Sequence, residues 1–179
     1  MEMSKYEDKN ISFNQQKAQI LPPTKALNLS YPWMNLRVKT QVSQCPQKVL
    51  KGFNQNLFKQ LSPPFPKVRI INFGGSKRGD LVELELNFAL FKQRWTSKIT
   101  EDFESEDELY FVDEGILLPF PLKRWRHKHL IKRNGNGSEI IDDIQFSGPN
   151  KIMDVLIYPF LALQFIYRKP IYRKIFGHN

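Results

Sequence analysis

The chain has 179 residues, a net charge of +9 and one cysteine. This length predicts a single domain with a substantial core. A single cysteine excludes an internal disulfide and is typical of proteins in a reducing compartment. Residues 1–16 lack the apolar stretch of a signal peptide. We therefore expect a cytoplasmic protein. The longest apolar run, residues 152–167, would span only about 24 Å as a helix, less than the ~30 Å of a bilayer core. The sequence therefore predicts no membrane span.

The excess of basic residues, 27 Lys and Arg against 18 Asp and Glu, raises the question of an anionic partner. The basic residues alternate with apolar ones or follow the last apolar segment, which is typical of ordinary solvated faces. The sequence contains no zinc-finger spacing, helix-turn-helix pattern or RNA-binding signature. We therefore predict no nucleic-acid partner, leave peripheral contact with an anionic membrane open, and expect a monomer or a weak homodimer.

Two regions differ in periodicity. Residues 1–33 show no clear period and are predicted to be a partly irregular N-terminal extension. Residues 34–177 are predicted to form the domain: residues 34–42 alternate as a half-buried strand, and residues 46–61 carry a helical apolar face that Pro63 and Pro64 end.

The rest of the domain reads as successive strands and one long helix. Residues 151–176 form the predicted C-terminal helix, where Pro159 and Pro170 are expected to cause a kink or a restart. Short turns between consecutive strands indicate an antiparallel sheet and an α+β fold. The predicted strands are residues 68–73, 81–89, 92–103 and 109–118, followed by a hairpin over residues 125–146.

The hairpin pattern predicts its register. A two-residue turn at Gly135 and Asn136, both expected at positive φ, pairs His129 with Asp142 and Trp125 with Phe146. The period of two also places cations on one face and aromatic, aliphatic and histidine side chains on the other. The cations, predicted to be solvated, are Arg124, Arg126 and Lys128.

Six motifs in order along residues 34–177 resemble the SRPBCC superfamily, also called START-like or birch-pollen-allergen-like helix-grip proteins, and more narrowly its bacterial members related to polyketide cyclases. The motifs are Pro46-Gln47-Lys48-Val49; Leu61-Ser62-Pro63-Pro64-Phe65; Phe111-Val112-Asp113-Glu114 with Pro119-Phe120; Trp125, His127 and His129; Gly137-Ser138, Asp142, Ile144 and Phe146; and Phe165, Tyr167, Arg168 and Phe176.

This resemblance implies a seven-stranded curved antiparallel sheet wrapped around a long C-terminal helix, with two short helices between strands 1 and 2. It also implies a cavity between the sheet and that helix that binds or carries a hydrophobic small molecule such as a lipid, sterol, quinone or polyketide-like compound. The alternative is a cyclase or dehydratase-type enzyme acting on a polyketide-like or aromatic substrate. We expect a volume of a few hundred cubic ångströms.

Four polar residues are the candidates for chemistry: His127, His129, Asp113 and Asp142. A histidine–carboxylate pair in an apolar pocket is able to act as acid and base. The same residues also fit a buried network that satisfies itself and fixes the strand register, and this interpretation is favoured. His-x-His with carboxylates is a possible zinc ligand set, but the further spacing of a cupin site is missing, so no metal and no cofactor are predicted.

The remaining candidates are large apolar side chains that serve equally as core or as cavity wall. Arg168, within an apolar helix, is expected to pair with an acidic group. The predicted ligand-binding residues are Trp95, Phe111, Trp125, His127, Phe146, Phe160, Leu163 and Tyr167.

Overall fold

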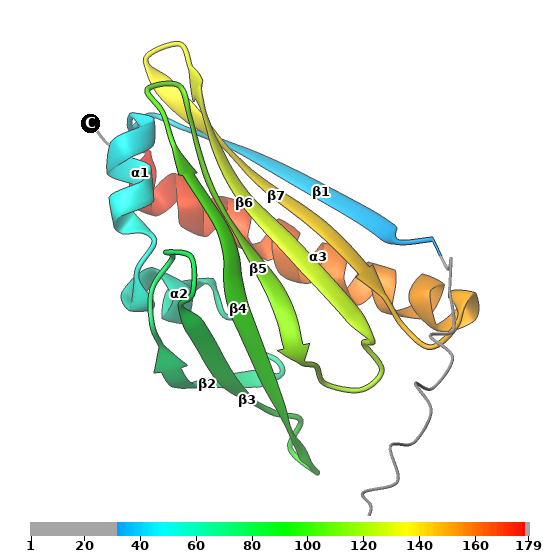
Figure 1. Cartoon of the computed structure of the whole chain (residues 1–179). Helices are drawn as coiled ribbons and strands as arrows, with labels where there is room; N and C mark the ends of the chain where they lie inside the picture. The colour runs from blue at the N-terminus through cyan, green and yellow to red at the C-terminus, as the bar shows by residue number, and fades with distance from the viewer. Residues whose placement is uncertain (1–31, 178–179) are drawn as a thin grey trace, which may run out of the picture. The chain divides into compact units, whose positions relative to one another are not determined.

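The computed structural model describes residues 32–177, so nearly all of the predicted extension, residues 1–33, lies outside the described residues. Seven strands and three helices are described in this range (Figure 1). The strands are β1 (Met34–Val42), β2 (Lys67–Phe73), β3 (Leu81–Asn87), β4 (Lys92–Glu104), β5 (Glu108–Leu117), β6 (Arg124–Asn134) and β7 (Gly137–Ser147). The helices are α1 (Pro46–Gly52), α2 (Gln55–Leu61) and α3 (Lys151–Phe176).

The strands form one antiparallel sheet in the order β1-β7-β6-β5-β4-β3-β2. Strands β2 to β7 follow one another as a meander because each turn between them is short, and β1 closes onto β7 at the far edge. Figure 1 shows α3 crossing one face of this sheet, with α1 and α2 at one end. The α+β fold class predicted from the sequence is confirmed.

The β6–β7 hairpin has the predicted register. Trp125 pairs with Phe146 and His129 with Asp142, and the strands turn at Gly135 and Asn136. Only Gly135 has a positive φ, 58°, so the expectation of positive φ at both turn residues is wrong. Positive φ at the first central residue alone is what a type II′ turn requires.

Helix α3 is continuous through both prolines, so the predicted restart at Pro159 does not occur. A proline at position i leaves the carbonyl of residue i−4 without its helical donor, here the carbonyls of Val155 and Ile166. Both of these residues lie on the exposed side of the helix, where water is able to bond to the freed carbonyls. The Asn150 side chain caps the helix start by accepting a hydrogen bond from Met153 N at 3.0 Å. Among residues 32–177, no helix is long and apolar enough to span a membrane.

Two hydrophobic clusters fix α3 against the β1–β7 side of the sheet. In the first, Leu161 and Phe165 of α3 pack with Leu36, Ile144 and Phe146. In the second, Tyr172 and Phe176 pack with residues of α1, α2, β6 and β7, among them Val49, Leu57, Ile131 and Ile140. Because α3 packs on this side, the inner face of strands β2 to β4 lies away from it.

The basic side chains on the outer face of β6 are half-buried, not freely solvated as the alternation predicted. Arg126 lies 3.2 Å from Glu101 and 3.5 Å from Glu114, on β4 and β5. Lys128 stands 3.6 Å from the centre of the Tyr110 ring. Carboxylates and aromatic rings of neighbouring strands therefore offset much of this positive charge.

Candidate ligand-binding cavity

A cavity of about 520 Å³ lies between the inner face of the sheet and helices α2 and α3. Most of its wall is apolar. The strands contribute Val68, Val82, Leu84, Leu86, Trp95, Ile99, Phe111 and Trp125; the helices contribute Leu57, Phe58, Leu61, Ile157, Leu161 and Phe165. This volume and lining confirm the expectation of a space of a few hundred cubic ångströms, not a solid core.

Three phenylalanines mark the rim of the cavity. Phe65, Phe120 and Phe160 all line it, and these residues are 61%, 69% and 72% exposed. They come from the segment after α2, the loop after β5 and helix α3. Large exposed apolar side chains at the edge of an apolar cavity indicate its opening to solvent.

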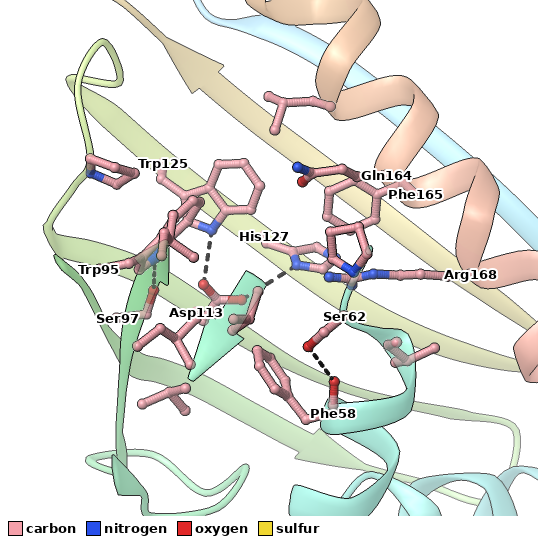
Figure 2. Close-up of a pocket in the computed structure, with 18 of the residues that line it drawn as sticks. Phe58, Ser62, Trp95, Ser97, Asp113, Trp125, His127, Gln164, Phe165 and Arg168 are labelled. Carbon is pink, nitrogen blue, oxygen red and sulfur yellow. Dashed lines mark hydrogen bonds and ion pairs between the residues drawn. The ribbon is translucent and has the colours of Figure 1, made fainter. Parts of the chain in front are cut away.

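Asp113, on β5, is the centre of a polar patch on the cavity wall (Figure 2). Its Oδ1 accepts a hydrogen bond from Trp125 Nε1 at 2.9 Å, and its Oδ2 lies 3.0 Å from His129 Nε2. His127 Nδ1 is 3.5 Å from the same Oδ2, and His127 Nε2 is 2.9 Å from Asp142 Oδ1. Two histidines and two carboxylates thus form one connected cluster.

The side-chain pairs in this cluster run diagonally across the strands. The backbone register places His129 opposite Asp142, as predicted, and His127 opposite Asp113. However, the short contacts join His129 to Asp113 and His127 to Asp142, while His129 Nδ1 is 3.9 Å from Asp142 Oδ1. The His129–Asp142 couple expected from the sequence is therefore not a direct hydrogen bond.

Helix α3 adds a positive charge to the cluster. Arg168 Nη1 lies 3.8 Å from Asp142 Oδ1, and the guanidinium stands 4.2 Å from the centre of the Phe165 ring. The prediction that Arg168 pairs with an acidic group is confirmed. Tyr172 is fully buried next to these groups, and its pKa is raised, first by burial and then by the charge of Asp142.

The environment of the cluster sets its charges. Burial alone would raise the pKa of Asp142, but the hydrogen bond and charge of His127 and the charge of Arg168 outweigh it, and the pKa is lowered. Burial would also raise the pKa of Asp113. The hydrogen bonds from His129 and Trp125 and the charges of the two histidines outweigh this effect, so the pKa of Asp113 is lowered. The pKa of His129 is lowered from 6.5 to about 4, mainly by burial and by the charge on His127, so His129 is neutral at neutral pH.

Both ring nitrogens of His127 face carboxylate oxygens, Nδ1 that of Asp113 and Nε2 that of Asp142. The two imidazole rings lie only 3.6 Å apart between centres, which disfavours a positive charge on both. The cluster therefore presents a neutral histidine, His129, to the cavity.

The structure brings most of the predicted site residues together. Trp95, Phe111, Trp125, His127 and Phe160 line the cavity, as do the chemical candidates His129 and Asp113. Asp142 lies behind this wall, 1% exposed.

Three predicted ligand-binding residues lie elsewhere. Phe146 is fully buried in the core against α3. Leu163 and Tyr167 point outward from α3, on a row of exposed apolar side chains. That row comprises Ile152, Val155, Leu156, Phe160, Leu163, Ile166 and Tyr167.

The sequence interpretation missed several residues that line the cavity. Gln164 and Arg168 line the cavity from α3, and Figure 2 shows both side chains pointing from the helix toward the region of His127. Phe53 and Phe58 line it from the α1–α2 region. The helical apolar face of residues 46–61 was the signal for this region, but none of its residues was predicted to bind the ligand.

No family model matches the sequence, and no curated protein is similar to it in sequence. Solved structures do share its fold. Norcoclaurine synthase from Thalictrum flavum has 15% identity and a TM-score of 0.56 over 86% of this chain and 95% of that chain. The Zhui aromatase/cyclase from a Streptomyces species has 12% identity and a TM-score of 0.54 over 79% of this chain and 96% of that one.

A third structure is the di-domain ARO/CYC StfQ from the steffimycin biosynthetic pathway. It has 9% identity and a TM-score of 0.58 over 81% of this chain but only 50% of its own, so this chain corresponds to about half of its length. At such identities, the likeness establishes the fold. The chain has an SRPBCC-like, or birch-pollen-allergen-like, helix-grip fold, which it shares with these three proteins.

Proposed function

We propose that this protein binds a largely apolar small molecule with at least one polar group in the cavity between the sheet, α2 and α3. The observation that carries the proposal is the cavity of about 520 Å³, whose wall is aromatic and aliphatic except for a few polar side chains. This combination is typical of sites that hold the body of a ligand by burial of apolar surface and orient it by hydrogen bonds.

The polar groups define one end of the ligand. His129, Gln164 and Arg168 face the cavity, and the neutral His129 is paired with Asp113. A hydroxyl or carbonyl group on the ligand meets hydrogen-bond donors and acceptors there, whereas the opposite wall offers mainly hydrocarbon. Aromatic polycycles, quinones, sterols and polyketide-like compounds share this chemistry, and Norcoclaurine synthase, with the same fold, forms a complex with dopamine and hydroxybenzaldehyde.

An enzyme of the cyclase or dehydratase type is the second candidate. The His129–Asp113 pair at the cavity wall favours it, because a neutral imidazole held by a carboxylate has the form of a general base. A histidine with a pKa of about 4, however, binds a proton weakly at neutral pH. General acid–base catalysis is most efficient when the pKa lies near the working pH, so the lowered pKa of His129 favours the proposal of binding without turnover.

The test uses two adjacent residues of α3. Gln164 lines the cavity, whereas Leu163 is 69% exposed on the outer side of the helix. Gln164→Trp is expected to reduce the affinity for a naphthalene-based fluorescent probe at least tenfold by filling the cavity, and Leu163→Trp to leave it unchanged. Both variants must keep the wild-type circular dichroism spectrum. Equal probe binding by all three proteins would refute the proposal.

A further inference from the structure

Three potential metal ligands converge on one point of the cavity wall. Asp113, His127 and His129 each offer an atom, and these atoms lie within 4.8 Å of one another. Asp113 Oδ2 is 3.0 Å from His129 Nε2 and 3.5 Å from His127 Nδ1. Ligands bound to tetrahedral zinc at about 2.0–2.2 Å lie roughly 3.3–3.5 Å apart, so small side-chain rotations bring these atoms to the required spacing. We propose that the three side chains bind a divalent transition-metal ion of the zinc type.

A second carboxylate is placed to support both histidine ligands. Asp142 is 1% exposed, and its Oδ1 lies 2.9 Å from His127 Nε2 and 3.9 Å from His129 Nδ1. These are the ring nitrogens that would not contact the ion. Histidine ligands of metals ordinarily donate their other N–H to a carboxylate or carbonyl, which fixes the tautomer and orients the ring. Here one buried carboxylate faces that nitrogen on both rings.

An unsatisfied atom provides independent support. His129 Nδ1 is buried and has no hydrogen-bond partner among the described residues, which is uncommon for a buried polar atom. When Nε2 binds a metal, the ring proton resides on Nδ1, and this N–H points toward the negative charge of Asp142. Metal binding therefore gives Nδ1 an electrostatic partner, whereas the metal-free cluster leaves it unused.

The site would open into the cavity. Asp113, His127 and His129 all line it, while Asp142 lies behind them. Three protein ligands leave a fourth position on a tetrahedral ion, which is available to water or to an oxygen atom of a bound molecule. Two imidazoles and one carboxylate favour Zn²⁺ or Co²⁺ over Mg²⁺ or Ca²⁺, which prefer all-oxygen sites. The site shares Asp113 and His129 with the polar end of the proposed ligand site, but burial of the body of the ligand rests on the apolar wall and needs no ion.

The test uses the untagged full-length chain after treatment with a chelator. Isothermal titration with Zn²⁺ should show one high-affinity ion per chain, and Co²⁺ should give the visible absorption of tetrahedral coordination without a thiolate band. His129→Gln and Asp113→Asn are expected to weaken Zn²⁺ binding at least 100-fold, and Asp142→Asn by about 10–100-fold. The matched controls Asp143→Asn, His178→Gln and Cys45→Ser should bind as the wild type does.

Wild-type protein alone provides a second measurement, in case a variant fails to fold. Because the chain has three histidines, ¹⁵N spectra of the imidazoles resolve them. One equivalent of Zn²⁺ should shift the ring resonances of His127 and His129 and place the proton of His129 on Nδ1. Absence of saturable Zn²⁺ binding, or binding that shifts only His178 or disappears in Cys45→Ser, would overturn the proposal. A metal-free protein that still binds the naphthalene probe would leave the proposed function intact.

Discussion

At the scale of single residues, His127 is the side chain that connects the two carboxylates of the polar cluster. It is 3% exposed and lies between Asp142, at 2.9 Å, and Asp113, at 3.5 Å. Without it, the cation nearest to Asp142 among the described residues is Arg168, at 3.8 Å, and the neutral His129 lies at 3.9 Å. A buried carboxylate with poor hydrogen bonding lowers the stability of the folded state, so His127 contributes more to stability than His129 does.

We therefore expect His127→Ala to lower the free energy of unfolding by about 2–3 kcal/mol, and His129→Ala by only about 1 kcal/mol. The difference arises because His129 hydrogen-bonds to Asp113, which retains the donor Trp125 Nε1 when His129 is removed. Urea unfolding of both variants measures these values. A larger loss in His129→Ala than in His127→Ala would show that the cluster is assigned incorrectly.

The lowered pKa of His129 predicts a specific pH dependence of stability. The unfolded chain binds a proton near pH 6.5, but the folded protein binds it only near pH 4, so protonation favours unfolding. This contribution is complete above pH 6.5 and is lost as the pH falls toward 4, by at most roughly 3 kcal/mol. The lowered pKa values of Asp113 and Asp142 add losses only below their ordinary value of 3.8.

Unfolding free energies between pH 7 and pH 4 check this dependence. The slope in this range should become smaller in His129→Gln, because glutamine does not titrate, and should persist in His178→Gln. An unchanged slope in His129→Gln would mean that His129 is protonated at about the same pH in the folded and unfolded states.

At the scale of elements, α3 tolerates two prolines because their positions expose the broken hydrogen bonds to water. Pro159→Ala should restore a donor for the carbonyl of Val155 and relieve the steric conflict of proline within a helix. We expect a gain of about 1–2 kcal/mol, less than the full helix-propensity difference of ~3 kcal/mol because the unfolded chain also becomes more flexible. Thermal melts of Pro159→Ala measure the gain. A lower melting temperature would indicate that the proline is required where it stands.

The hairpin and α3 also show how much of the structure the sequence could predict. The strict alternation of residues 124–131 and the Gly135-Asn136 turn fix the strand register, so the backbone pairing of His129 with Asp142 was predictable. The diagonal contacts of the side chains were not, because they depend on rotamers and on Asp113 of a third strand. The strand register determines which residues are neighbours across the strands. The side-chain torsion angles then determine which of these neighbours form hydrogen bonds.

Helix α3 was harder to orient from its sequence. Large apolar residues occur on opposite sides of the helix. The helical periodicity of the sequence therefore does not show which side faces the sheet. Leu163 and Tyr167 were placed inward and lie outside, whereas the polar Gln164 and Arg168 lie inside. The orientation follows from the pairing of Arg168 with Asp142 of the polar cluster, and the sequence predicted an acidic partner for Arg168 without identifying which one.

At the scale of the whole molecule, the cavity follows from the position of α3. Helix α3 packs on β1 and β7, at one edge of the seven-stranded sheet, and the shorter helix α2 lines the cavity. The space over β2 to β4 is therefore enclosed without being filled. The protein also carries a second apolar surface, the outer row of α3 that includes Leu156, Leu163 and Ile166. Within residues 32–177, this outer row offers an apolar probe an alternative to the cavity, and the proposed function requires binding in the cavity.

Nuclear Overhauser effects between a bound naphthalene derivative and the methyl groups of the protein distinguish these two places most directly. The measurement uses the full chain with labelled Leu, Ile and Val methyl groups, at a ratio of one ligand per chain. We predict contacts to Leu57, Leu84 and Ile99, whose side chains line the cavity. Contacts confined to Leu156, Leu163 and Ile166, on the outer face of α3, would contradict the claim that the cavity is the binding site.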